Sequence, residues 1–252
     1  MPKTKFLKIL DNGQDTRAVC YALAHSPKAN HVRGPKKKLS SEARLKIDAR
    51  YSYEKLSDLL AYHFSDCPAY FLTLTYDDAH LPANREAAIK NMSDRYFPRI
   101  RKHRKAHGQA KLKYVYCTED RHGDARLHHH VILNGGGPDD LEVLESLWSF
   151  GFIDIKRYDP ARYEEVARYM TKEAHAPGYK TGAHSWTPSR GLKRPTPVST
   201  RVDAGYKLEL PTGAIEIDHD HKDNVFGEYH YLRYTLPDAH KLPHSERKIA
   251  GL

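Results

Sequence analysis

Between residues 69 and 158 the sequence switches between strand-like and helix-like segments in an order that few folds accommodate. β-Branched and aromatic residues predict four strands, at AYFLTLTY (69–76), KLKYVYCTE (111–119), RLHHHVIL (126–133) and GFIDIKRY (151–158). Helical periodicity predicts helices over 85–106, with an interruption near Pro98, and over 139–148. The order β-α-β-β-α-β is typical of a ferredoxin-like antiparallel sheet. We therefore expect an α+β fold centred on this unit.

Three blocks divide the chain. Residues 1–65 form a basic N-terminal extension that contains the linker HVRGPKKKL and a predicted helix over 41–64. Residues 66–176 form the central domain, which ends in a further predicted helix over 161–174. Residues 177–252 form a C-terminal extension expected to pack on that domain, with predicted strands at GYKLEL (205–210) and EYHYLRYTL (228–236) and turns at PTG (211–213) and KDN (222–224).

The charge of the chain narrows the class of partner. Its 252 residues include 41 Lys and Arg against 32 Asp and Glu, and the net charge of +9 favours a polyanion such as nucleic acid, although a solvated basic surface has the same composition. Neither a membrane-length apolar run nor a signal-peptide core occurs, so we expect a cytoplasmic protein with no membrane partner. The three cysteines form no Cys-x-x-Cys pair and indicate neither a disulfide framework nor a cysteine zinc site.

Three consecutive histidines, 128 to 130, lie inside the predicted strand 126–133. Because successive strand side chains point to opposite faces, His128 and His130 share one face and His129 lies on the other. The face of His129 also carries Leu127, Val131 and Leu133, and we expect it to pack against the two helices. His128 and His130 then lie on the open face, where two imidazoles spaced i, i+2 can bind one metal ion.

A third ligand is expected from the preceding strand. If Gly123 and Asp124 form a two-residue hairpin turn, Glu119 lies opposite His128 on the same face, with Cβ atoms about 4.5 to 5.5 Å apart. Two histidines and one carboxylate leave coordination positions open, which favours Mn²⁺ or Mg²⁺ with bound phosphate over a closed structural zinc. His122 is an alternative ligand. Ordinary hydrogen bonds of half-buried strand histidines are the alternative to any metal.

The helix predicted over 161–174 carries a candidate nucleophile. At about 100° per residue its apolar stripe contains Val166, Ala167, Met170 and Ala174. Tyr163 lies within this stripe, whereas Tyr169 lies at its edge, where it can pack on the sheet and keep its hydroxyl free. Lys172 shares the face of Tyr169, with Glu173 beside it. A tyrosine next to a lysine and a phosphate-polarising metal is suited to attack a phosphoryl group, although Tyr-x-x-Lys alone is a weak motif.

The segments FLTLTYDD, LHHHVIL and ARYMTKE, in this order and at these distances, resemble the three motifs of HUH-superfamily rolling-circle replication initiators (Rep). They look most similar to microvirus-type initiators and related bacterial or plasmid Rep proteins, and WTPSRGLKRP (186–195) also resembles a segment of that group. The resemblance covers about residues 69 to 195. His129 departs from the family pattern, which usually has an apolar or aromatic residue there.

The resemblance implies an HUH endonuclease domain that nicks single-stranded DNA at an origin. His128, His130 and Glu119 would bind Mn²⁺ or Mg²⁺. Tyr169 would attack the scissile phosphate, giving a 5′-phosphotyrosine and a free 3′-hydroxyl, while Lys172 steadies the phosphate. It also implies single-stranded DNA or an origin hairpin as partner, a host replicative helicase and polymerase acting afterwards, and a phage, plasmid or bacterial genome as the source.

Two further groups are candidates for DNA binding. Phe71, Thr73 and Thr75 share the open face of the first strand, although threonines are also simply good strand formers. Basic side chains of the 85–106 helix suit phosphates, namely Arg95, Arg99, Arg101, Lys102, Arg104 and Lys105, although an isolated basic helix is also an ordinary solvated face. An HUH transposase or relaxase would use the same chemistry. A non-catalytic ferredoxin-like nucleic-acid-binding module would explain the charge but not the metal set.

Overall fold

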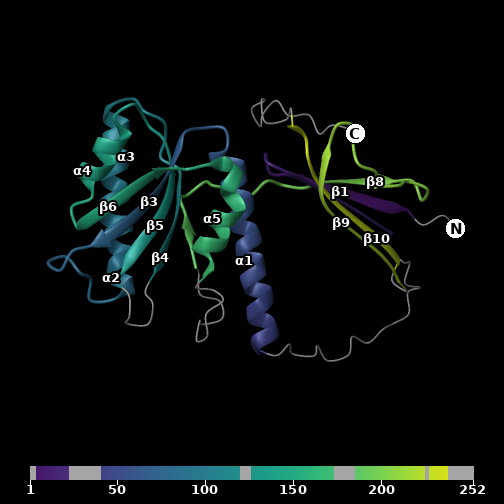
Figure 1. Ribbon diagram of the computed structural model, residues 1–252, viewed down its shortest axis with the longest axis horizontal. Coiled ribbons are helices and arrows are strands. Elements are labelled where there is room, and N and C mark those ends of the chain that lie inside the picture. The colour runs from purple at the N-terminus through teal and green to yellow at the C-terminus, as the bar shows by residue number, and fades with distance from the viewer. Residues whose placement is uncertain (1–3, 23–40, 120–125, 173–184, 225–226, 238–252) are drawn as a thin grey trace. The chain divides into compact units, whose positions relative to one another are not determined.

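The computed structural model describes residues 4–22, 41–119, 126–172, 185–224 and 227–237 (Figure 1). The chain is a mixed α+β protein with two antiparallel five-stranded sheets. It separates into two compact units, residues 40–193 and a terminal unit made of residues 1–39 and 194–252. In the described part of the chain, no helix is long and apolar enough to span a membrane.

The sheet of the 40–193 unit has the order β6-β3-β5-β4-β7, and every neighbouring pair is antiparallel. Its central strands are β3 (Ala69–Tyr76) and β5 (His128–Asn134). The outer strands are β6 (Gly151–Arg157), β4 (Tyr114–Glu119) and the short β7 (Thr187–Pro188). All four strands predicted in this region are therefore present. β7, which was not predicted, adds the WTPSRGLKRP segment to the edge at β4.

One face of this sheet is covered by the helices that connect its strands, as Figure 1 shows. These helices are α2 (Arg85–Lys90), a π-helical segment (Asn91–Tyr96), α3 (Phe97–Ala106) and α4 (Asp140–Leu147). Between them and the strands lies a buried core that includes Leu72, Val131, Phe97 and Leu144.

The interruption expected near Pro98 takes the form of the π-helical segment. Proline lacks a backbone N–H and cannot complete the regular helical ladder, so it is favoured in the first turn of a helix. Pro98 lies in the first turn of α3, and the preceding N–H, that of Phe97, bonds to the carbonyl of Met92 five residues back. The helix thus continues across the proline by widening for one turn.

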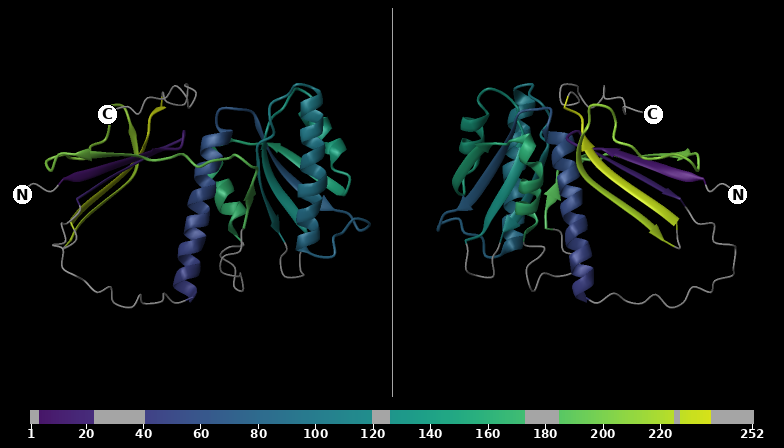
Figure 2. Two further views of the ribbon diagram at one scale, coloured as in Figure 1. Left: turned by 180° about the vertical axis from the view of Figure 1, so that it is seen from behind. Right: turned by 45° about the vertical axis from the view of Figure 1, so that its right-hand side comes forward.

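The opposite face of the sheet is covered by α1 (Ser41–Phe64) and α5 (Tyr163–Met170), which follows a 3₁₀ turn at Pro160–Arg162. Both helices lie on the same side of the sheet in the two views of Figure 2. Their core includes Leu60 from α1, Ala167 and Met170 from α5, and Ile132 from β5. The helix expected over 41–64 is confirmed, and α5 covers the open face as expected. Its apolar stripe was expected to extend to Ala174, which lies outside the described residues.

The terminal unit contains a sheet of order β8-β1-β2-β10-β9. Its strands are β1 (Lys5–Asp11), β2 (Thr16–Ala22), β8 (Val198–Val202), β9 (Ile215–Asn224) and β10 (Gly227–Thr235). One face carries a small core built on Leu7, Cys20, Leu232 and Tyr234. The strand predicted at 228–236 is confirmed as β10.

Two predictions for this region are wrong. Residues 205–210 form no strand, because Tyr206 closes a turn on the carbonyl of Asp203 and, with Leu208, packs its side chain against the core. Residues 222–224 form no turn, because backbone pairing with β10 continues strand β9 to Asn224. The turn predicted at 211–213 is confirmed by the bond from the N–H of Ala214 to the carbonyl of Pro211.

Candidate metal and tyrosine site

The strand register places three potential ligands on one face of the sheet. Glu119 of β4 pairs with His128 of β5, as the sequence predicted, and Cys117 pairs with His130. Glu119, His128 and His130 offer ligand atoms that all lie within 4.8 Å of one another. The hairpin turn proposed at Gly123 and Asp124, and the alternative ligand His122, lie outside the described residues.

The distances suit ligands of one ion. Nε2 of His128 is 3.3 Å from Oε2 of Glu119, and Nε2 of His130 is 3.4 Å from Oε1. Two ligands that each lie about 2.0 to 2.2 Å from a shared ion are separated by roughly 3 to 3.5 Å. Oε1 of Glu119 is buried and receives no well-oriented hydrogen bond, although Nζ of Lys172 lies 2.9 Å away. A carboxylate oxygen left in this state is suited to a cation.

The contact behind the His128 ring selects the tautomer that a metal needs, and the contact behind the His130 ring is compatible with it. Nδ1 of His128 lies 2.8 Å from the carbonyl oxygen of Arg126, to which it can donate. Nδ1 of His130 lies 3.2 Å from Oγ1 of Thr73. A hydrogen on each Nδ1 leaves both Nε2 atoms as acceptors directed at Glu119. Partners of this kind orient metal-binding imidazoles in known sites.

The electrostatics of the group favour cation binding. Burial would raise the pKa of Glu119, but its contacts with Lys172 and with the protonated form of His128 outweigh it and hold that pKa at about 2 in the absence of a metal. The same carboxylate raises the pKa of His128. Burial lowers the pKa of His130 to about 4, so its ring is neutral at pH 7. An ionised carboxylate and a neutral imidazole are the ligand forms that bind divalent ions.

Tyr169 projects from α5 toward this group. Its hydroxyl lies 3.0 Å from Nε2 of His130, and 42% of the residue's surface is exposed. Nζ of Lys172 lies 3.8 Å from the centre of the Tyr169 ring. Tyr163, by contrast, is buried in the core between α5 and the sheet.

Lys172 does not lie on the helix, contrary to expectation. α5 ends at Met170, and Thr171 donates to the carbonyl of Ala167 through both its N–H and its hydroxyl. Lys172 therefore reaches Glu119 from the turn that follows α5. Glu173, expected beside it, lies outside the described residues.

His129 points to the other face, as strand parity predicted. Its Nε2 lies 2.9 Å from the hydroxyl of Tyr76, and its Nδ1 lies 2.9 Å from Oγ1 of Thr118. The ring is fully buried, and burial lowers the pKa of His129 to about 3. This histidine is a neutral, hydrogen-bonded core residue.

The first strand contributes differently from what the sequence suggested. Thr73 and Thr75 pair with His130 and His128, respectively, and both are half-buried. Thr73 is occupied in holding the His130 ring. Phe71, expected together with the two threonines to meet DNA, stacks on that ring at 5.4 Å between centroids and contacts the Tyr169 ring edge-on at 6.3 Å. These positioning contacts are long-range and left no local signal in the sequence.

The basic helix lies on the opposite layer from the histidine and carboxylate group. Arg95, Arg99, Arg101, Lys102 and Lys105 are exposed on the π-helical segment and α3. Arg99 donates to Oγ of Ser149, and Arg101 donates to the hydroxyl of Tyr114. Arg104 is the exception, because it is 3% exposed and its guanidinium donates to both the side chain and the carbonyl of Asn134. The side chain of Arg104 is thus occupied within the fold rather than available to phosphates.

A second cluster of potential ligands occurs in the terminal unit. His221, Glu228 and His230 lie near one another on β9 and β10. Its carboxylate pairs with Lys5 at 2.8 Å, much as Glu119 pairs with Lys172 at 2.9 Å, but the group is more exposed than Glu119 and its neighbours. The buried group beside Tyr169 is therefore the better candidate for a metal centre.

Comparison with known proteins identifies relatives of the site-bearing segment. Residues 69–174 match the family model described as replication-associated protein ORF2/G2P. This range contains Glu119, both open-face histidines, Tyr169 and Lys172. The resemblance to phage-type Rep proteins, expected from the motifs, is confirmed. No solved structure matches the chain.

Individual relatives are replication-associated proteins of small phages. Replication-associated protein ORF2 of Spiroplasma virus 4 is 28% identical over 131 residues, which cover 44% of this chain and 40% of that protein. Replication-associated protein VP4 of Bdellovibrio phage phiMH2K is 28% identical over 152 residues, which cover 50% of this chain and 46% of that protein. The matched region thus spans less than half the length of each of these relatives.

Proposed function

Because the chain resembles phage replication-associated proteins, we propose that it initiates replication by nicking single-stranded DNA at an origin. In this proposal the 66–176 segment is an HUH endonuclease domain, flanked by the extensions 1–65 and 177–252. The free 3′-hydroxyl left by the nick would prime rolling-circle synthesis by a host polymerase and helicase.

One observation carries the proposal. A tyrosine hydroxyl, that of Tyr169, lies 3.0 Å from a histidine nitrogen that belongs to a buried histidine and carboxylate group. Nucleophilic catalysis needs this pairing of an attacking oxygen with charge-stabilising groups. A nucleic-acid-binding module without catalysis has no need of it.

The fold supports the same assignment. Counted along the chain, β3, β4, β5 and β6 are the first to fourth strands of the β-α-β-β-α-β unit. Their order in the sheet, β6-β3-β5-β4, is fourth-first-third-second. In this antiparallel order each helix connects two strands that have another strand between them, as in a split β-α-β unit. We assign the unit to the ferredoxin-like class on this basis.

The proposed reaction divides roles among the residues. Glu119, His128 and His130 would hold Mn²⁺ or Mg²⁺, which when bound polarises the scissile phosphate and stabilises its charge. The oxygen of Tyr169 attacks the phosphorus and loses its proton to solvent or a neighbouring base. The bond to the 3′ oxygen breaks, and that oxygen takes up a proton. The products are a 5′-phosphotyrosine and a 3′-hydroxyl.

Lys172 contributes positive charge at the attacking group. Its ammonium lies above the Tyr169 ring and 2.9 Å from Glu119. Burial opposes the charge, but Glu119 outweighs this effect and raises the pKa of Lys172, so it is a cation at pH 7. A cation in this position can attract the phosphate to the tyrosine.

DNA is proposed to contact both layers of the unit. Near the metal group, the half-buried Thr75 and Phe71 border the face on which the scissile strand would lie. On the opposite layer, exposed cations of α3 such as Lys102 and Lys105 are suited to the phosphates of flanking DNA or an origin hairpin. Arg104 is left out of this surface because it is buried.

The nicking reaction is tested by a covalent adduct. Single-stranded oligonucleotides of random sequence, labelled at the 3′ end, are incubated with the chain and Mn²⁺ or Mg²⁺ and separated on a denaturing gel. A 5′-phosphotyrosine retains the 3′ label on the protein, and sequencing of the bound DNA gives the preferred site. Chelation with EDTA and the Tyr169→Phe variant should each abolish the adduct, whereas Tyr163→Phe should retain it.

The same experiment separates the alternatives. DNA that binds without any adduct under either metal would contradict the nuclease and favour a non-catalytic binding module. An HUH transposase or relaxase would also form the adduct, but the sequence recovered would then come from an element end or a transfer origin rather than a replication origin.

A further inference from the structure

The face of the terminal sheet that points away from its core carries a row of aromatic rings. Leu7, Cys20 and Leu232 lie on the core face. Strand alternation therefore directs Phe6, Tyr21 and Tyr229 to the opposite face. These three side chains are partly exposed and come from the neighbouring strands β1, β2 and β10.

The strand register aligns these rings and adds a cation at each end. Phe6 pairs with Tyr21, and Tyr21 pairs with Tyr229. At the two edges of the sheet, Arg201 of β8 pairs with Phe6, and Lys222 of β9 pairs with Tyr229. One line across all five strands thus reads Arg201, Phe6, Tyr21, Tyr229, Lys222, and we call it the aromatic row.

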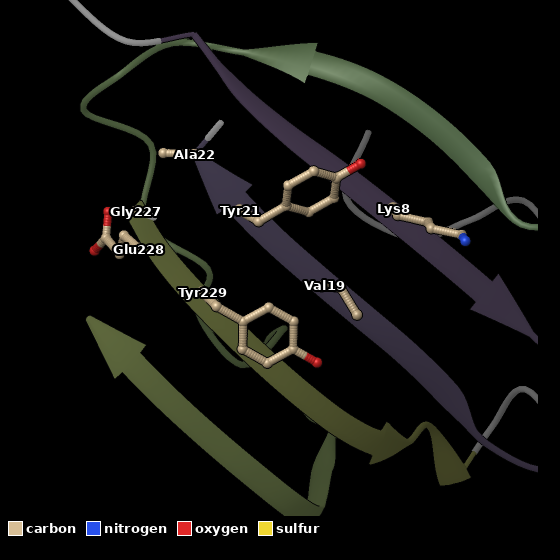
Figure 3. A pocket seen from close by; sticks show the side chains of 7 residues that line it. All are labelled: Lys8, Val19, Tyr21, Ala22, Gly227, Glu228 and Tyr229. Carbon is tan, nitrogen blue, oxygen red and sulfur yellow. The ribbon is translucent and has the colours of Figure 1, made fainter. Parts of the chain in front are cut away.

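The row borders a shallow hollow rather than a filled surface. Tyr21 and Tyr229 line a cavity of about 450 Å³, together with Lys8, Val19 and Glu228, whose carboxylate is paired with Lys5. Figure 3 shows the two tyrosine rings above neighbouring strands, with Lys8 on the same face. The Phe6 and Tyr21 rings lie 5.7 Å apart with an angle of 23° between their planes, and the Arg201 guanidinium lies 5.8 Å from the Phe6 ring.

Sheet stability alone explains part of this pattern. Aromatic cross-strand pairs stabilise antiparallel sheets, and cations on edge strands hinder edge-to-edge aggregation. Neither reason applies to Lys8, which is exposed on the inner strand β1 beside the hollow. Among the residues that the structure describes, Lys8 has no ion-pair partner. Lys222, by contrast, is paired with Asp220 at 2.6 Å. Flat rings beside an unneutralised cation such as Lys8 are the combination that binds single-stranded nucleic acid.

We infer that the aromatic row is a second binding surface for single-stranded DNA. Bases would stack on Phe6, Tyr21 and Tyr229, while Lys8 and Arg201 contact the phosphates. The choice of DNA over RNA rests on the proposed nicking function. The surface lies outside residues 69–174, the segment that matches replication-associated proteins. Because this surface and the nuclease site belong to one chain, a DNA strand that is long enough to bind both surfaces at once is bound more tightly than a short one.

Binding is measured in the complete chain carrying Tyr169→Phe, with EDTA, so that cleavage and metal do not contribute. The probe is fluorescein-labelled oligo(dT) of about 30 nucleotides, long enough for several sites. Combining Tyr21→Leu with Tyr229→Leu keeps apolar packing but removes stacking, and should weaken binding by about tenfold or more. Tyr21→Phe keeps the ring and should bind like the parent. Lys8→Ala should flatten the dependence of log affinity on log salt, whereas the exposed Lys207→Ala should not.

Each outcome decides the inference. A folded double Leu variant that binds oligo(dT) like the parent overturns it. If that variant does not fold, unchanged affinity and salt dependence in Lys8→Ala and Arg201→Ala overturn it instead. Tighter binding of oligo(rU) than of oligo(dT) would overturn DNA as the occupant. Adduct formation is assayed separately, in chains that retain Tyr169. If no adduct forms but oligo(dT) binding still depends on the aromatic row, the nuclease proposal is contradicted and the inference about the row is supported.

Discussion

The hydroxyl of Tyr169 and Nε2 of His130 lie 3.0 Å apart, so the proposed nucleophile contacts the same nitrogen that the proposed metal would need. His130 also stacks on Phe71 and lies within hydrogen-bond distance of Thr73, which limits its ring to one orientation. Metal binding would therefore replace the tyrosine as the partner of Nε2 and release the hydroxyl next to the ion.

This competition predicts an effect on metal affinity. Tyr169→Phe removes a hydrogen bond that the ion must displace, a contact worth about 0.5 to 1.5 kcal/mol. We expect the variant to bind Mn²⁺ as tightly as the parent or up to about tenfold more tightly, while forming no adduct. Isothermal titration calorimetry measures the affinity. A large loss of Mn²⁺ binding would instead make Tyr169 a ligand.

The three histidines should separate into two classes. His128→Ala or His130→Ala removes a proposed ligand and should abolish Mn²⁺ binding. His128→Ala, which truncates the less buried of the two rings, should change thermal stability little. His129→Ala should leave the Mn²⁺ ligands in place but lower the free energy of unfolding by about 2 to 4 kcal/mol, because Tyr76 and Thr118 lose a buried partner. Calorimetry and thermal melts of the three variants provide both measurements. Loss of Mn²⁺ binding in a folded His129→Ala chain would contradict the division by strand face.

Glu119→Gln keeps the shape of the side chain but removes its charge. We expect Mn²⁺ affinity to fall by about tenfold or more, since the carboxylate is the single anionic ligand of the proposed set. The β4–β5 pairing should persist, and circular dichroism should be unchanged. Glu54→Gln, at a half-buried carboxylate of α1 paired with Arg50, is a charge-matched control that should leave metal affinity intact. Equal Mn²⁺ affinity in both variants would remove Glu119 from the site.

The buried arginine of α3 should differ from its exposed neighbours. Arg104→Ala removes charged hydrogen bonds to Asn134 inside the fold and should lower the free energy of unfolding by about 3 kcal/mol. Lys102 is two residues before Arg104 and is exposed. Lys102→Ala should leave stability unchanged and weaken binding to single-stranded DNA by about two- to tenfold, and the affinity of the variant should depend less on salt. Thermal melts and fluorescence anisotropy test both. Stability equal to the parent in Arg104→Ala would contradict its structural role.

Strand parity explains why the histidine group could be located from the sequence. A period of two fixes which side chains share a face, and one turn position then fixes which residue of the next strand lies opposite. That argument correctly paired Glu119 with His128. It carried no information on Thr73 and Phe71, which reach His130 from β3, a strand more than 50 residues earlier.

The missed strands lacked the signal on which strand prediction depends. Strand β9, with the sequence IEIDHDHKDN, is exposed along almost its whole length and is held by backbone pairing with β10. None of the side chains at 215–223 is buried, and alternation between apolar and polar residues is confined to the first four residues of the strand. Strands β1 and β2 pair with β8 and β10, which come about 200 residues later in the chain. Pairing over such separations leaves no mark within a local window.

The number of nucleophiles is the last feature that the structure makes testable. Initiators that alternate between two tyrosines need both on one helix face, three or four residues apart. Tyr163 and Tyr169 are six apart, which at about 100° per residue directs them roughly 240° from one another. Tyr163 is accordingly buried in the core, whereas Tyr169 contacts His130.

We therefore expect a single nucleophile, with a second protomer or a second round of reaction needed to rejoin the DNA. Mass spectrometry of the digested adduct should find DNA on Tyr169 in the parent and none in Tyr169→Phe, and a nucleotide attached to Tyr163 would require a different mechanism.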